Sequence, residues 1–535
     1  MSDPSPASVT PPPATPVEAY DIRHGIACAL VSVLIGTTQS LGINMINSNL
    51  TAIQGSLGVT AAEIGWLTSA FWATYLSTSL LMTKFRLQYG LRLFTNIAIS
   101  CFLAGTIILL FADDMRSAIF VRAMQGFAAA CLSTLALLYM VESMPKKFAL
   151  VGLVLGIGTL QLGAPLSRIL PESLLEIGRW QGLNILDMSL AVIALGAINA
   201  IRLMPPPRQK VFCPGDIFAF VFYAISLGLM AIVLTQGRTV WWTDSEWLGI
   251  MLAISILCFG VYLHLDLHRS SPLLDLKWLF GPFMRRLLLT IVLFRLVLSE
   301  QTVGAVGLLN ALGMNNDQMQ ILFVWILLST VLGFIVAGLI IATGKLHIPG
   351  LVALLLVCLG AWLDSNSTSL TRPSELYFSQ SLIAFGSSMY LSSAIALGFT
   401  KLMEGGMKNF PSFAAVFSGG QALATLAASA WLSTFVVDAQ KLHFSELSQY
   451  LSLANPQVAS RISQMAAGFS GTSSDRAAAT SRALATLGQQ ANVEASVRAY
   501  NDTFEVIAAV AALTFLWLLI VNLMRNIENK KTLST

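Results

Sequence analysis

Stretches of roughly 20 apolar residues recur along most of the chain, separated by short polar and basic segments. Each stretch is long enough to cross about 30 Å of hydrocarbon as a helix. A helix also satisfies its own backbone hydrogen bonds, which lipid cannot do. The pattern predicts an all-α polytopic membrane protein of fourteen spans, at about 25–48, 62–82, 93–112, 117–141, 148–166, 184–203, 216–236, 246–265, 287–309, 318–342, 348–363, 375–399, 410–436 and 504–524.

The stretch at 205–282 divides these helices into two groups of six. It opens on the polar junction MPPPRQKVFCPGD, holds two apolar segments and closes on the basic junction HRSSPLLDLKWLFGPFMRR. We expect its two helices to pack at the periphery, because the two six-helix halves should form the cavity between them. The predicted organisation is a disordered cytoplasmic tail at 1–22, a six-helix bundle at 23–204, the central insertion at 205–282, a C-terminal bundle at 283–436, an extracytoplasmic helical loop at 437–503, and the last helix with a cytoplasmic tail at 504–535.

The segment at 437–503 differs from the rest because it is rich in Ala, Ser and Gln. Its apolar residues recur at three- and four-residue spacing, with breaks at Pro456 and around Gly468. This pattern predicts two or three helices outside the membrane.

Composition and charge agree with a membrane protein. Hydrophobic residues make up 55% of the chain and charged residues 11%, with a net charge of +4. With the N-terminus inside, nineteen Lys and Arg residues fall on the cytoplasmic side and five in the short outer loops. Such an excess is expected inside. The basic residues lie at segment ends rather than in a nucleic-acid patch, so we expect no nucleic-acid partner.

The chain lacks patterns of enzyme chemistry. It has no GxxxxGK[ST] phosphate loop, its five histidines form no ligand pair on a helix, and its six cysteines show no metal-ligand spacing. We therefore expect no enzyme activity, no cofactor and no metal.

Charges within the spans carry the most information, because burying them in lipid is costly and they usually mark a pathway or a structural pair. Arg122 lies in VRAMQGFAAA of the fourth span, and Arg295 and Glu300 lie in the ninth. Counted from Arg286 at 1.5 Å per residue, Arg295 is about 14 Å deep and Glu300 about 21 Å deep. Both interpretations, a functional site and a structural pair, stay open for each.

Other polar residues are less distinctive. Gln39, Asn44 and Asn47 form a stripe in the first span, and Gln125 follows Arg122 by three residues. These four could line a substrate cavity or join neighbouring helices by hydrogen bonds. Three charged residues nearer the span ends read as loop or interface residues: Glu142, Arg168 and Asp187.

The motif RAMQG at 122–126, with Gly126 at its end, resembles the RxxQG motif of helix 4 in the major facilitator superfamily. The central pair of helices, with LTQGRTVWWTDSEW and SSPLLDLKWL, resembles the fourteen-helix drug:proton antiporters of the EmrB/QacA type. Three stretches agree: LRLF after Gly90, FSGGQAL at 417–423 with Gly419 and Gly420, and AYNDTF at 499–504.

The chain departs from that family in three motifs. Its first helix has LGINMINSNLT where relatives have LDxTxVNxALP, so Gly42 replaces the acid that usually carries the proton. The loop between helices 2 and 3 has Thr83 and Leu87 where relatives have Gly and Asp. The helix 5 motif is reduced to LGAPLSRI, which keeps Pro165.

The resemblance implies two six-helix bundles plus two central helices, and an inner-membrane exporter of drugs or amphipathic small molecules by proton antiport. Both termini would be cytoplasmic. Glu300 is then the best proton-carrying acid, with Arg122 and Arg295 as candidates for tuning it. The implied partners are a small-molecule substrate, protons, membrane lipid, a periplasmic adaptor protein and an outer-membrane channel. The alternatives are an importer or permease of a small organic solute and a non-transporting membrane assembly protein.

Overall fold

The computed structural model describes residues 21–111, 114–170, 181–201, 203, 214–269, 272–405, 409–452, 454–469 and 476–534. The tail expected at 1–22 and the junction at 205–213 lie almost wholly outside the described residues. The described part is built of helices, so the predicted all-helical class is confirmed.

The N-terminal half places each expected span on one helix or two. The fifth span is divided at Leu162, where Gly163 lies against the backbone of Ser40 and Pro165 follows it in the next helix. The elements are α1 (Ile22–Ser48), α2 (Leu50–Leu57), α3 (Ala61–Tyr89), α4 (Leu91–Leu110), α5 (Met115–Glu142), η1 (Lys146–Phe148), α6 (Ala149–Gln161), α7 (Gly163–Ile169) and α8 (Gln181–Ala200).

The remainder of the chain contains two π-helical turns, named η3 and η6, each inside an expected span. The elements are α9 (Pro214–Val240), α10 (Glu246–Leu267), α11 (Leu276–Leu279), α12 (Pro282–Ser299), η3 (Glu300–Ala305), α13 (Val306–Ala311), α14 (Asn316–Ala342), α15 (Ile348–Asp364), η4 (Pro373–Leu376), α16 (Tyr377–Gly405), α17 (Phe410–Ala415), η6 (Val416–Gly420), α18 (Gln421–Tyr450), α19 (Pro456–Phe469) and α20 (Arg476–Ser534).

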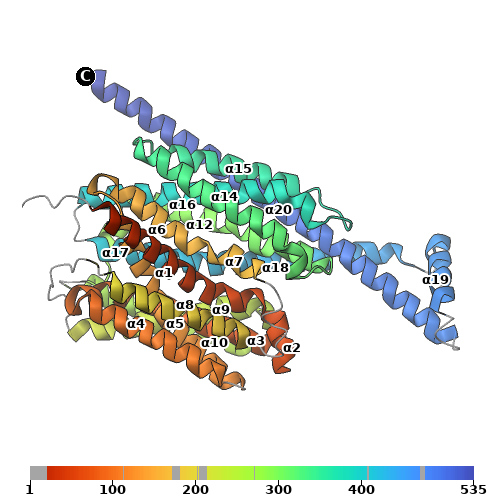
Figure 1. Cartoon of the computed structure of the whole chain (residues 1–535). Coiled ribbons are helices and arrows are strands. Elements are labelled where there is room, and N and C mark those ends of the chain that lie inside the picture. The colour runs from red at the N-terminus through yellow and green to blue at the C-terminus, as the bar shows by residue number, and fades with distance from the viewer. Residues whose placement is uncertain are drawn as a thin grey trace, which may run out of the picture.

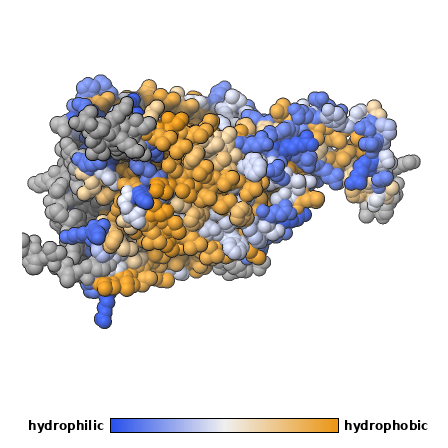
Figure 2. Space-filling view, turned by 90° about the horizontal axis from the view of Figure 1, so that it is seen from above, coloured by the Kyte–Doolittle hydropathy of each residue, from blue (hydrophilic) through white to orange (hydrophobic). Residues whose placement is uncertain are grey.

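The helices form a multi-pass membrane body. Among the described residues, ten helices are long and apolar enough to cross a membrane, and three shorter helices are also apolar. Figure 2 shows a broad hydrophobic band on the body, while the projecting end of the molecule is mostly hydrophilic. Side chains such as Leu257 and Leu339, each 66% exposed, face outward on this body. Lipid covers such side chains without cost.

The central pair is joined to the N-terminal half by a buried ionic contact. Helix α9 packs on α3, α10 and α18. The carboxylate of Asp216 at its start lies 3.2 Å from Lys84 Nζ of α3 and 2.6 Å from Arg269 Nη2 after α10. These contacts place the pair beside the second and thirteenth spans, at the edge of the body.

The polar segment at 437–503 is not separate from the spans beside it. Helix α18 continues to Tyr450, and α20 runs for 59 residues from Arg476 to Ser534, so neither boundary is a break in a helix. Only α19 is independent of a span within the described residues (Figure 1). The reason is composition, because the Ala-rich sequence after Arg476 contains no proline that would end the helix.

Candidate functional site

Glu300, the acid expected to carry the proton, is fully buried where α12 passes into η3. The side-chain amide of Gln380 in α16 donates to Glu300 Oε1 at 2.9 Å and to Asp364 Oδ2 at 2.8 Å. Asp364 ends α15 and is 2% exposed, and Gln380 is completely buried. One amide therefore bridges two buried carboxyl groups that come from different helices. These three residues are called the carboxyl pair site below.

The two carboxyl groups of this site also interact electrostatically with each other, since both bind the same amide nitrogen of Gln380. Oε2 of Glu300 has no hydrogen-bond donor among the described residues. Two carboxylates so close in an apolar body would repel strongly, whereas one carboxylate and one carboxylic acid attract. The geometry therefore suits a pair that shares a proton.

The turn that holds Glu300 is shaped by the last helix. A Cβ at Gly304 would lie 2.7 Å from Phe504 Cε1, and one at Gly307 would lie 2.5 Å from the Tyr500 hydroxyl. Both aromatic residues belong to the AYNDTF stretch, which thus packs against η3. In the same stretch the Asn501 amide donates to the Ser367 carbonyl at 2.8 Å. A π-helical turn of this kind commonly occurs at functional sites.

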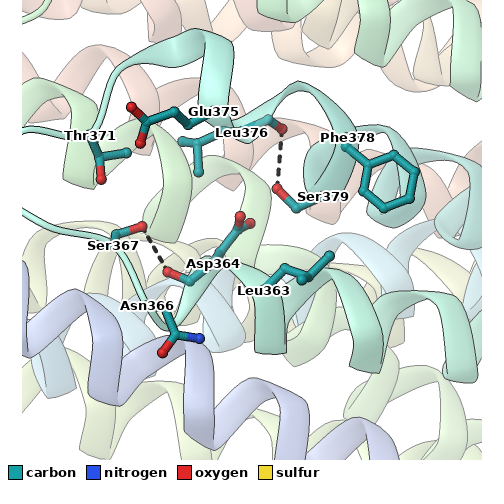
Figure 3. A pocket seen from close by; sticks show the side chains of 9 residues that line it. All are labelled: Leu363, Asp364, Asn366, Ser367, Thr371, Glu375, Leu376, Phe378 and Ser379. Atoms are coloured by element: carbon teal, nitrogen blue, oxygen red, sulfur yellow. Dashed lines mark hydrogen bonds between the residues drawn. The ribbon is translucent and has the colours of Figure 1, made fainter.

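A pocket of about 230 Å³ connects Asp364 to the surface. Of the side chains that line it in Figure 3, Asp364 and Ser379 are buried and Glu375 is exposed. Asn366, Glu375 and Phe378 in its wall are exposed. Asp364 is thus the member of the carboxyl pair site that lines this pocket, while Gln380 and Glu300 lie behind it. Its lining is Leu363, Asp364, Asn366, Ser367, Thr371, Glu375, Leu376, Phe378 and Ser379.

Arg122 lies apart from this site, fully buried in α5. Its Nη1 donates to the Gly42 carbonyl at 2.9 Å and to Gln125 Oε1 at 2.8 Å, and its guanidinium stacks 4.7 Å from the Phe71 ring centroid. Gly126 allows the close approach of α5 to α3, because a Cβ there would lie 2.3 Å from the Phe71 carbonyl. The RAMQG stretch therefore positions a buried cation.

Arg295 has a third environment. Its guanidinium donates to Gln421 Oε1, directly after Gly419 and Gly420 of the FSGGQAL stretch. A Cβ at Gly419 would lie 2.8 Å from Ser79 Oγ of α3, so this glycine lets the thirteenth span approach the second. Arg295 thus joins the ninth span to the thirteenth.

Among the described contacts, Glu300 forms no ion pair with Arg122 or Arg295, the two candidates for tuning it. Glu300 interacts with another acid, Asp364, through Gln380. The physical reason is helix geometry: residues five apart point to different faces, and Arg122 belongs to the other half. Asp364 and Gln380 escaped sequence reasoning because one closes an apolar span and the other resembles a helix-packing amide.

The polar stripe of α1 divides between two roles. The Asn44 amide donates to Ser40 O of its own helix at 2.8 Å, and Asn47 Oδ1 accepts from Thr68 Oγ1 of α3 at 2.9 Å. Gln39 is 3% exposed, and its Oε1 has no partner among the described residues. Gln39 is thus the member of this stripe with unused capacity for a substrate or water.

Its position near the end of a span had suggested that Asp187 is a loop or interface residue. In the structure, Asp187 lies inside the bundle. It is 4% exposed on α8 and interacts electrostatically with Arg122. The backbone of α8 carries it toward Gly42 of α1, where the missing side chain leaves room.

Two further polar groups join helices near their ends. Arg168 Nη1 donates to Asn316 Oδ1 at 2.7 Å, which links α7 to α14 of the other half. At the opposite end of α1, His24 Nε2 lies 3.5 Å from Glu142 Oε1 and 3.4 Å from Cys28 Sγ. Among the described residues, this is the group of three that could hold a metal ion. The patterns of histidines alone and of cysteines alone missed this group, although the four-residue spacing of His24 and Cys28 places both on one helix face.

Comparison with known proteins identifies the family. The model of the Major Facilitator Superfamily matches residues 32–398. The fold resembles the human organic anion transporter MFSD10, with a TM-score of 0.54 and 14% identity over 94% of this chain and 100% of that one. It also resembles the proton:xylose symporter XylE, with a TM-score of 0.53 and 11% identity over 94% and 96%.

Curated relatives match more locally. The uncharacterized transporter YebQ of Escherichia coli is 22% identical over 48% of this chain and 55% of its own length. The fatty acid resistance protein FarB of Neisseria gonorrhoeae is 21% identical over 48% and 51%. A triacylglyceride transporter of Mycobacteroides abscessus is 25% identical over 51% and 54%. The matches cover about half the length of these relatives. Because the family model covers most of the chain, the protein belongs to the Major Facilitator Superfamily and is a membrane transporter rather than an enzyme.

Proposed function

We propose that this protein is a fourteen-span proton antiporter of the inner membrane that exports amphipathic, lipid-like molecules. The observation that carries this proposal is the carboxyl pair site, in which Gln380 bridges buried Glu300 and Asp364 beneath a surface pocket. A secondary transporter needs a group whose proton affinity differs between its two open states. A pair of buried acids that shares one proton has this property.

The fourteen spans correspond to α1, α3, α4, α5, α6 with α7, α8, α9, α10, α12 with α13, α14, α15, α16, α17 with α18, and α20. Counted from a cytoplasmic N-terminus, α15 ends on the outer side, and so do α18 and the start of α20. The pocket at Asp364 then opens outward, which is the side from which an exporter takes up protons. The two bundles at 23–204 and 283–436 remain the moving halves of this proposal.

The coupling step follows from the geometry. A proton from outside reaches Asp364 through the pocket and passes to Glu300, which binds the same Gln380 amide nitrogen. Gln380 holds both groups in place and loses no bond in the exchange. When the halves rearrange, Glu300 faces the cytoplasmic path and releases the proton. Two carboxyl groups close together hold that proton, because a second charge is expensive in an apolar site, so its release requires the rearrangement.

The substrate class rests on the relatives, one named for fatty acid resistance and another for triacylglycerides. Molecules of this kind are apolar with one polar end, which suits a site between apolar helices with a few polar groups such as Gln39. The projecting helices α18, α19 and α20 would meet a periplasmic adaptor and an outer-membrane channel. No specific contact favours import or a non-transporting role over export.

The test is proton movement driven by substrate in proteoliposomes, with a long-chain fatty acid as the probe. Glu300→Gln and Asp364→Asn should each abolish coupled movement while the protein stays folded. The matched control is Glu375→Gln. Glu375 is an exposed residue of the pocket lining and takes no part in the two hydrogen bonds of the carboxyl pair site. Coupled proton movement equal to wild type in a stable Glu300→Gln protein would exclude the proposed role.

A further inference from the structure

A second buried acid lies in the N-terminal half. Asp187 of α8 is 4% exposed, and the helices packed against α8 are α1 and α4. A Cβ built on Gly42 of α1 would lie 3.3 Å from Asp187 Oδ2 and 3.4 Å from Oδ1, with Phe102 of α4 at 3.3 Å. The carboxyl group of Asp187 therefore rests directly against the bare backbone of α1.

The charged group that acts on this carboxyl is Arg122 of α5. The two do not form a direct ion pair among the described contacts. Arg122 instead donates through Nη1 to the Gly42 carbonyl and to Gln125. Gly42 thus lies between the two charges, with its carbonyl bound to the cation and its Cα against the anion. Phe102 and Gly42 carry no charge, so Arg122 sets the field at Asp187.

Both charges keep unused hydrogen-bonding atoms. Asp187 Oδ1 and the Nε and Nη2 atoms of Arg122 have no hydrogen-bond partner within the described part of the chain. A pair that only held the bundle together would be expected to close into a bidentate ion pair, because buried unsatisfied polar groups are costly. The open geometry indicates instead a group that changes its state during the cycle.

We propose that Asp187 is a second proton-accepting residue, whose carboxyl group lies beside Gly42, the position without an acid. Through its bond to the Gly42 carbonyl, Arg122 transmits the change in the charge of Asp187 to α1. This inference rests on the proposed proton coupling but concerns a different half of the protein from the carboxyl pair site. An ionised Asp187 attracts the guanidinium. A protonated one releases it, and the bond from Arg122 to the Gly42 carbonyl then changes the contact between α1 and α5.

The geometry also explains why only one of positions 42 and 187 holds an acid. A side chain at position 42 would begin within van der Waals contact of the Asp187 oxygens, so a carboxylate there would face a like charge. An acid moved from position 187 to position 42 should therefore restore the proton uptake that is lost when the acid is removed from position 187. This exchange separates a proton-accepting role from a packing role.

The experiment measures proton uptake by the purified full-length protein in detergent, with a pH-sensitive dye and a downward pH step. Asp187→Asn should lower the uptake by about one proton per chain, as linkage requires for one lost site. The double variant Gly42→Asp/Asp187→Ala should recover it. Ser189→Ala serves as the matched control, because Ser189 lies on the same helix with its hydroxyl bonded to Ile185 O.

A second double variant tests the structural alternative. Arg122→Gln/Asp187→Asn removes both charges, so it should recover the thermal stability that either single change loses. Its proton uptake should stay low. Wild-type proton uptake in a folded Asp187→Asn protein, or failure of the Gly42→Asp/Asp187→Ala exchange in a folded protein, would overturn the proposal. The carboxyl pair site is tested separately, because Glu300→Gln should lower the uptake in the Asp187→Asn background as well.

Discussion

The two halves of this transporter bury charge in opposite ways. In the C-terminal half, two acids face each other and a neutral amide holds them together. In the N-terminal half, a cation and an anion approach the same glycine without meeting. A like-charge pair is relieved by adding a proton, whereas an opposite-charge pair is weakened by one. The halves should therefore respond differently when one charged group is neutralised.

The largest effect is expected at Glu300. Glu300→Gln should reduce substrate-driven proton movement by at least about 100-fold, since removal of an essential proton-transfer group has consequences of that order. Glu300→Asp should keep part of the activity because an acid remains on a shorter side chain. Thermal melting of Glu300→Gln should be nearly unchanged, because Gln keeps the size of the side chain and no cation is left unpaired. A strong drop in melting temperature would show that Glu300 has a cationic partner after all.

Neutralising the cation of the N-terminal half should act mainly on stability. Arg122→Gln leaves Asp187 buried without its counter-charge, at a cost of about 3–5 kcal/mol. Folded yield after detergent extraction, together with the melting temperature, measures this loss. Adding Asp187→Asn should recover most of it. If the double variant were no more stable than the single one, the two charges would not be coupled.

A smaller effect is expected where the last helix packs on the acid turn. Gly304→Val would place side-chain atoms against Phe504, whose Cε1 lies 2.7 Å from the added Cβ. Overpacking of this kind costs about 1–3 kcal/mol. It should also displace η3 and lower proton coupling. Gly260→Val, where nothing lies within 4 Å of an added Cβ, controls for the loss of glycine, and Gly304→Val/Phe504→Leu should partly restore both readouts.

The smallest effect is expected outside the carboxyl pair site and the Arg122–Asp187 pair. His443 Nε2 lies 2.7 Å from Asp502 Oδ2 and joins α18 to α20 in the polar part. Because Asp502 is 44% exposed, His443→Ala should cost less than about 1 kcal/mol. Transport by His443→Ala in proteoliposomes should match wild type. A large loss of transport would mean that this extension does more than project from the body.

Several features could be predicted from the sequence because they depend on local pattern alone. The apolar stretches determined the helical membrane class, and most of their bounds fall within a few residues of the helix ends. The cost of charge in lipid singled out Arg122, Arg295 and Glu300 as unusual. The helices run on past 436 and 503, since an Ala-rich polar sequence continues a helix as readily as an apolar one.

What the tertiary structure decided was the partner of each charge. Asp364 and Gln380 reach Glu300 from 64 and 80 residues away, and Asp187 reaches Gly42 from 145. Helical periodicity assigns a residue to a face of its own helix, but the neighbouring helix on that face depends on how the whole bundle packs. The sequence by itself therefore determined which residues could not be ordinary lipid-facing side chains. Only the packing of the helices determined that Glu300 lies beside an acid, that Arg295 binds an amide, and that Arg122 and Asp187 approach the same glycine.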